Sequence, residues 1–116
     1  MAIVILQNKL TKEDIIKARE EYPGYIKVTV DLFQKIVVIG GEYHADSEKI
    51  LIEKFGSKQK DIWGGGYNIN TNKFEVNALV NLRVPMNDSM DILNPEIRNA
   101  FLKLVESRLS NIQSLT

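Results

Sequence analysis

The most informative absence in this 116-residue chain is cysteine. Without cysteine the protein has no disulfide scaffold, no thiolate zinc site and no cysteine nucleophile. Net charge is absent too, because fifteen basic residues balance fifteen acidic ones, whereas nucleic acid or anionic lipid attracts a net positive face. No apolar run approaches the ~18 residues of a transmembrane helix, and the first ten residues lack the features of a signal peptide. We therefore expect a cytoplasmic protein with neither a nucleic-acid nor a membrane partner.

The composition is that of an ordinary globular protein, with 44% hydrophobic and 26% charged residues. A chain of this length buries roughly 60 to 70% of its unfolded surface, which is enough for a core without disulfides or metals. We expect one domain over residues 1–116, and we expect it to form a homo-oligomer.

Hydrophobic patterning alternates between strand and helix types along the chain. Strands are predicted at residues 3–6, 25–31, 36–39, 61–70 and 74–84, and helices at 12–21, 46–55 and 95–110. The order βαββαββα predicts an α+β fold, a mostly antiparallel sheet with its helices on one face. It contains the string of the ferredoxin-like split βαβ fold, with an added strand and C-terminal helix.

The helix starts carry local signals. Thr11 with Asp14 three residues later predicts an N-cap of the capping-box type. Asp46 is the predicted N-cap of the second helix, and Asn94 followed by proline predicts the start of the last one.

The segments 61–70 and 74–84 predict a hairpin with Thr71 and Asn72 as turn residues. In that register Tyr67 faces Val76, and the large apolar residues of both strands share one side. We therefore expect one core that contains Trp63, Tyr67, Phe74, Val76, Val80, Phe101 and Leu104.

The same register places Gly64 and Gly66 on the opposite, polar side, beside Asn77 and diagonal to Asn81. A strand surface without side chains, next to two amides, is a candidate site for a flat or anionic ligand. A β-bulge or the close approach of another backbone explains the same glycines without a ligand.

The densest polar cluster is the segment 40–48, at a predicted strand-to-helix junction. Glu42, His44 and Asp46 are two residues apart, and an extended chain would project them from one face. They are candidate ligands of a divalent metal, or candidate catalytic residues with an oriented acid/base histidine. The structural alternative is a histidine that only caps or hydrogen-bonds, with Asp46 as a helix cap.

Arg83 ends the polar face of the predicted 74–84 strand. Its planar guanidinium suits a carboxylate or a phosphate, so we predict that Arg83 and His44 share a cleft in which an anion binds. An ion pair of Arg83 with Glu42 or Asp61 would use the same groups without a ligand.

Two sequence runs, GGEYHADSE at 40–48 and GSKQKDIWG at 56–64, are followed by an asparagine and then by arginine and proline near 81–85. In these runs the chain resembles an uncharacterised prokaryotic family classed as a domain of unknown function. The family has leucine where this chain has Tyr43. The resemblance implies no activity, but it groups six residues: Glu42, His44, Asp46, Gln59, Trp63 and Arg83.

Two functions are consistent with these features. The first is binding of a small polar or anionic ligand by Arg83, Gln59 and the glycine strand, with hydrolytic or acid/base chemistry at the His44 cluster. The second is a non-catalytic protein-protein interaction module that uses the polar sheet face and the 85–94 loop. Convergence of His44, Arg83 and Gln59 on one concave pocket would favour the first.

Overall fold

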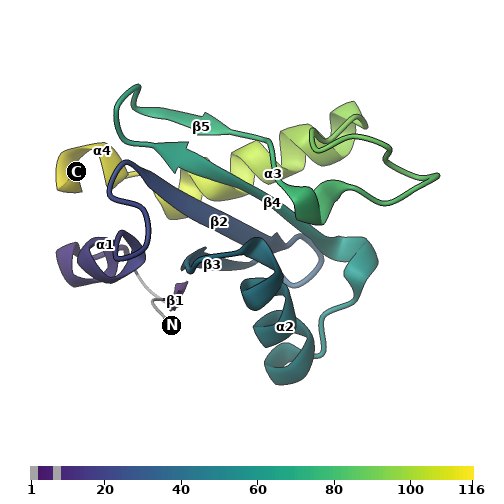
Figure 1. Cartoon of the computed structure of the whole chain (residues 1–116), viewed down its shortest axis with the longest axis horizontal. Helices are drawn as coiled ribbons and strands as arrows, with labels where there is room; N and C mark the ends of the chain where they lie inside the picture. The colour runs from purple at the N-terminus through teal and green to yellow at the C-terminus, as the bar shows by residue number, and fades with distance from the viewer. Residues whose placement is uncertain (1–2, 7–8) are drawn as a thin grey trace.

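The computed structural model describes residues 3–6 and 9–116. Its elements are β1 (Ile3–Leu6), α1 (Lys12–Ala18), β2 (Tyr25–Asp31), β3 (Ile36–Gly40), α2 (His44–Phe55), the 3-10 turn η1 (Gln59–Asp61), β4 (Ile62–Asn68), β5 (Lys73–Glu75), the 3-10 turn η2 (Leu79–Asn81), α3 (Pro95–Arg108) and α4 (Ile112–Leu115). The strands form one sheet in the order β1-β3-β2-β4-β5 (Figure 1). Every strand pair in these residues is antiparallel, which confirms the predicted α+β class.

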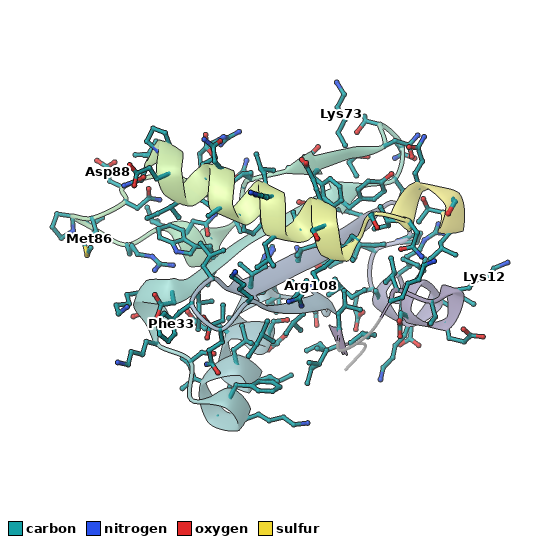
Figure 2. The ribbon with its side chains drawn as sticks, turned by 180° about the vertical axis from the view of Figure 1, so that it is seen from behind. Lys12, Phe33, Lys73, Met86, Asp88 and Arg108 are labelled. Atoms are coloured by element: carbon teal, nitrogen blue, oxygen red, sulfur yellow. The ribbon has the colours of Figure 1, made fainter. Side chains whose placement is uncertain are left out.

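The helices cover both faces of the sheet. Helices α1, α3 and α4 contribute Ile15, Phe101 and Ile112 to the main core. Helix α2 lies on the opposite face, where Leu51 packs with Val38 in a second cluster. Figure 1 shows α3 behind the sheet, and Figure 2, from behind, shows it in front.

The position of α2 differs from the expectation that all helices share one face. The reason lies in β3, whose first four residues are all apolar, so both of its faces need cover. The ferredoxin-like arrangement is formed only in part. Strand β3 lies between β1 and β2 and is antiparallel to both, as in a split βαβ unit, but β4 pairs with β2, whereas the fourth strand of the ferredoxin-like fold pairs with the first.

The predicted core is formed with one exception. Trp63, Tyr67 and Phe101 are buried in the main cluster, which Val76 also joins and against which Phe74 and Leu104 pack. Val80 instead packs in the second cluster beside α2.

Val80 changes clusters because the predicted 74–84 strand ends at Glu75 and turns into η2. Beyond Glu75 the side chain of Asn81 takes the place of a strand. Its Oδ1 accepts a hydrogen bond from Gly64 N at 2.8 Å, and its Nδ2 donates to Gly64 O at 2.8 Å. The β4–β5 register also differs by two residues from the predicted one, since Tyr67 pairs with Phe74. A shift of two preserves the faces, which is why the core prediction holds.

The predicted starts of the first and last helices are confirmed. Thr11 and Asp14 form a complete capping box, with Thr11 Oγ1 accepting from Asp14 N at 3.2 Å and Asp14 Oδ2 accepting from Thr11 N at 3.0 Å. Asn94 Oδ1 accepts hydrogen bonds from the amides of Glu96 and Ile97. Among the helices of the described residues, none combines the length and hydropathy needed to cross a membrane.

Candidate functional site

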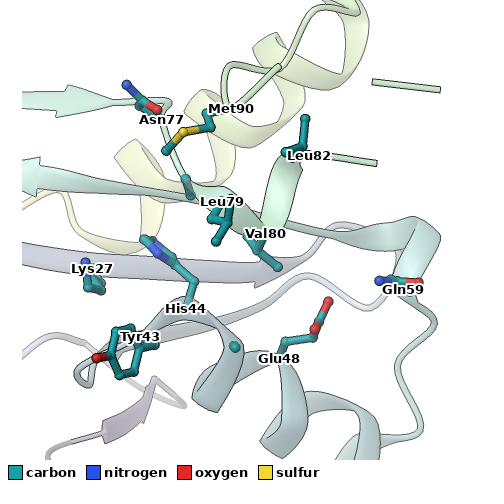
Figure 3. Close-up of a pocket in the computed structure, with 12 residues that line it drawn as sticks. Lys27, Tyr43, His44, Glu48, Gln59, Asn77, Leu79, Val80, Leu82 and Met90 are labelled. Carbon is teal, nitrogen blue, oxygen red and sulfur yellow. The ribbon is translucent and has the colours of Figure 1, made fainter. Parts of the chain in front are cut away.

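A cavity of about 480 Å³ lies between the first turns of α2 and the chain around η2 (Figure 3). This volume is in the range of small-molecule sites, about 300 to 1,000 Å³. Its polar lining includes Lys27, His44, Glu48, Gln59 and Asn77, and its apolar lining includes Leu79, Val80, Leu82 and Met90. We refer to it as the α2 pocket.

His44 is the central polar group of this pocket. Its Nε2 lies 2.7 Å from Gly65 O, and because a carbonyl oxygen only accepts, Nε2 carries the proton. Burial lowers the pKa of His44 to about 4, with the Gly65 hydrogen bond opposing the shift and the positive charge of Lys27 adding to it. The ring is therefore neutral at pH 7.

The other ring nitrogen, Nδ1, is left with a free lone pair. The Cδ2–Nε2 edge of the ring lies against the strand, since a Cβ on Gly64 would come within 2.8 Å of Cδ2. Nδ1 lies on the far side of the ring, and no group in residues 3–6 and 9–116 donates a hydrogen bond to it. A neutral acceptor is thus displayed inside an otherwise mixed polar and apolar pocket (Figure 3).

The predicted glycine floor is not an open ligand surface. A Cβ on Gly64 would meet Val80 Cγ1 at 2.7 Å, and one on Gly66 would meet the Tyr25 ring at 2.3 Å. The glycines allow these side chains and His44 to sit against the sheet. Close packing, the alternative explanation without a ligand, therefore accounts for Gly64 and Gly66. Asn81 is buried too, and its side-chain amide is hydrogen-bonded to the backbone N and O of Gly64.

Arg83 lies outside the set of residues that line the α2 pocket. Its Nη1 donates to Gln59 O at 2.7 Å, and its Nη2 donates to the carbonyls of Ile62 and Val80. The guanidinium carbon is 4.0 Å from the centre of the Trp63 ring. Arg83 therefore links η1, β4 and η2 through hydrogen bonds. The prediction that Arg83 and His44 share a cleft is wrong. Neither Glu42 nor Asp61 forms the alternative ion pair; Asp61 pairs with Lys60.

The extended Glu42, His44 and Asp46 set is also not formed. Helix α2 begins at His44, so the last two residues are on a helix, and Glu42 is exposed before it. The N-cap is Tyr43, which makes no side-chain cap hydrogen bond, so Asp46 is not the predicted cap. Across the part of the chain that the structure describes, no group of three His, Cys, Asp or Glu residues is arranged to hold a metal ion.

Of the predicted ligand-binding residues, Gln59 and Asn77 do line the pocket with His44. The sequence reading missed Lys27 and Glu48. Glu48 carried a usable signal, because it is four residues after His44 and so lies on the same side of a helix. The sequence signal for Lys27 was weaker: it is the one cation on the polar side of β2, and in the sheet it lies opposite Gly66 of β4.

The fold and the pocket define an α+β protein with a cavity at the junction of a strand and a helix. Residues 4–108 match the family described as Protein of unknown function (DUF5674), and the chain belongs to that family. No curated protein and no solved structure matches the chain.

Proposed function

We propose that the protein binds a small molecule with both hydrogen-bonding and apolar parts in the α2 pocket. The observation that carries this proposal is the neutral His44, with Nε2 held by Gly65 O and Nδ1 left as a free acceptor. An acceptor that lies in a pocket and has no partner among the described residues is suited to a ligand that supplies the missing O–H or N–H.

The pKa of His44 favours binding over acid/base catalysis. A general acid or base works best when its pKa is near the working pH, whereas that of His44 is about 4. At pH 7 such a ring has almost no protonated form and is a weak base. We therefore assign His44 a role in recognition.

Lys27 supports the expectation of a polar or anionic ligand. It is the cation that lines the pocket, and it raises the local potential enough to lower the pKa of His44. The apolar wall of Leu79, Val80 and Met90 supplies the opposite surface for a hydrocarbon or ring.

A fragment screen by thermal shift tests this function. A ligand at 100 times its dissociation constant adds about 2.7 kcal/mol to stability, and amide chemical shifts should place it against Lys27, His44 and Val80. His44→Leu should weaken binding by about tenfold or more while the amide spectrum remains that of a folded protein. Glu42→Gln is the matched control, because Glu42 is exposed and does not line the pocket. Hits that map elsewhere, or that bind His44→Leu unchanged, contradict the proposal.

One observation favours the interaction-module function as a second candidate. Val84, Met86 and Leu93 are 76%, 85% and 54% exposed around the 85–94 loop, and Figure 2 shows Met86 at the end of the molecule. The loop is held in shape by Asn87, whose Nδ2 donates to three carbonyls and whose Oδ1 accepts from Leu93 N. A preorganised apolar loop is suited to contact with another protein.

The homo-oligomer we expect provides the test of that second candidate. If the loop joins two copies, sedimentation should show concentration-dependent association that Met86→Glu abolishes without lowering the melting temperature. A chain that remains monomeric at high concentration contradicts the self-association.

A further inference from the structure

Two side chains of opposite charge line the α2 pocket, and they do not pair with each other. They are Lys27 of β2 and Glu48 of α2. The ion pairs found within the described ranges are Lys60 with Asp61 and Arg98 with Asp91, and neither involves the pocket charges. In Figure 3 the two pocket charges lie on either side of His44.

Glu48 has an unsatisfied oxygen. Its Oε2 is buried, and no protein group within the described residues donates a hydrogen bond to it. Burial lowers the pKa of Arg83, and the Glu48 carboxylate is close enough to oppose that shift. However, the Nη donors of Arg83 go to the carbonyls of Gln59, Ile62 and Val80, and its buried Nε forms no hydrogen bond with Glu48 or with any other described residue. A buried carboxylate oxygen without a donor is costly, and a cationic or N–H donor would relieve it.

Lys27 is compensated only in part. Its Nζ lies 4.7 Å from the centre of the Tyr22 ring and 5.7 Å from that of Tyr25. The faces of aromatic rings attract a cation but do not replace a carboxylate. The ammonium is partly desolvated by burial, which lowers the pKa of Lys27, and it has no anionic partner in residues 3–6 and 9–116.

We propose that the ligand of the α2 pocket is a zwitterion, with its anionic group at Lys27, its cationic group at Glu48 and its apolar body against Leu79, Val80 and Met90. This inference rests on the proposed function. A simple anion would leave Glu48 unpaired and would meet its repulsion, and a simple amine would be repelled by Lys27. One molecule with both charges satisfies both residues, and its intervening N–H or O–H groups can donate to His44 Nδ1.

A series of linear ω-amino acids of increasing length tests the charge pattern. Each is compared with the alkanoic acid and the alkylamine of the same carbon number, by amide chemical-shift titration of the full chain. In the wild type, the ω-amino acid whose length matches the pocket should bind about tenfold tighter than either control. In Glu48→Gln this amino acid should bind no better than its acid, and in Lys27→Gln no better than its amine.

The outcomes separate the two proposals. A wild type that binds the acid or the amine as tightly as the amino acid overturns the zwitterion and leaves small-molecule binding in the α2 pocket intact. An equal weakening of all three probes in Glu48→Gln also overturns it, since the residue would then act on pocket structure alone. If no probe shifts the pocket amides the zwitterion is again overturned, and the proposed function is then decided by the fragment screen with His44→Leu, which includes uncharged molecules.

Discussion

Gly64 and Gly65 are adjacent in β4 but face opposite sides of the sheet, and they serve two different surfaces. At Gly65 the space of a side chain is taken by the backbone oxygen of Glu75 and by the ring of Phe101, so this face is closed core. At Gly64 it is taken by Val80 and His44, which line the α2 pocket. The same residue type therefore allows tight packing on one face and seats a pocket histidine on the other. Glycine in a strand marks a close approach, and the approaching group determines whether that approach is structural or functional.

A matched pair of substitutions, Gly65→Ala and Gly64→Ala, is the most direct test of this difference between the two faces of β4. The Cβ at position 65 would be 2.2 Å from Glu75 O, and β5 cannot move away without losing its pairing with β4. We expect Gly65→Ala to lower the free energy of unfolding by more than roughly 3 kcal/mol in chemical denaturation.

Gly64→Ala should be milder and local to the pocket. Its Cβ would meet three side chains, with Val80 Cγ1 at 2.7 Å, His44 Cδ2 at 2.8 Å and Ala78 Cβ at 3.1 Å. The two closest, Val80 and His44, can rotate. We expect a loss of about 1 to 3 kcal/mol together with a rise in the pKa of His44, measured from its ring resonances, as the ring leaves Gly65 O and becomes more hydrated. Equal losses in the two variants, with His44 unperturbed in both, would contradict the distinction between the faces.

An effect of similar size is the pH dependence that His44 gives to stability. Its pKa is about 4 in the folded state and 6.5 in its ordinary state, so the unfolded chain binds the proton first as the pH falls. Stability from this group is constant above pH 6.5, falls as the pH drops toward about 4 and then levels off, for a total loss of roughly 3 kcal/mol.

Urea denaturation of the wild type and His44→Leu over this pH range isolates that contribution. The carboxylates, including Asp31 with its lowered pKa, titrate in both proteins and cancel in the difference. The difference in unfolding free energy should change between pH 6.5 and 4 and be flat above. A difference that does not vary with pH would show that His44 is not held neutral by burial.

The same contrast explains how much of the fold could be predicted from sequence. Caps such as Thr11 and Asn94 act on amides within three residues, so local sequence suffices to find them. The alternation that placed Tyr67 and Trp63 in the core survives a register shift of two. The end of β5 was missed because Asn81 replaces the strand with a side chain that reaches Gly64, seventeen residues away. No local pattern reveals such a contact.

The candidate site was predicted only in part for a related reason. His44 was identified by its chemistry, Asn77 by its place beside the glycine strand and Gln59 by the family resemblance, and all three line one pocket. Arg83 was also identified by its chemistry, yet its Nη donors are bonded to carbonyls of three separate segments. The residue type shows which groups a side chain can bind. Only the fold shows whether that side chain is already bonded to other parts of the protein.

The smallest expected effect concerns Asp46. Its substitution distinguishes a side chain that caps a helix from one that only places a charge near the helix end. Asp46 lies in the first turn of α2, and the side chain of the N-cap residue Tyr43 makes no cap bond. A carboxylate there interacts with the helix dipole alone, which contributes about 0.3 to 1 kcal/mol and weakens with salt. Asp46→Asn and Asp46→Ala should therefore lose the same small amount, and that loss should shrink in high salt. Thr11→Ala is the positive control, because Thr11 caps α1 through a complete capping box and should lose about 1 kcal/mol at any salt concentration. If Asp46→Asn is neutral while Asp46→Ala loses as much as Thr11→Ala, Asp46 acts as a cap in solution, and α2 begins later than His44.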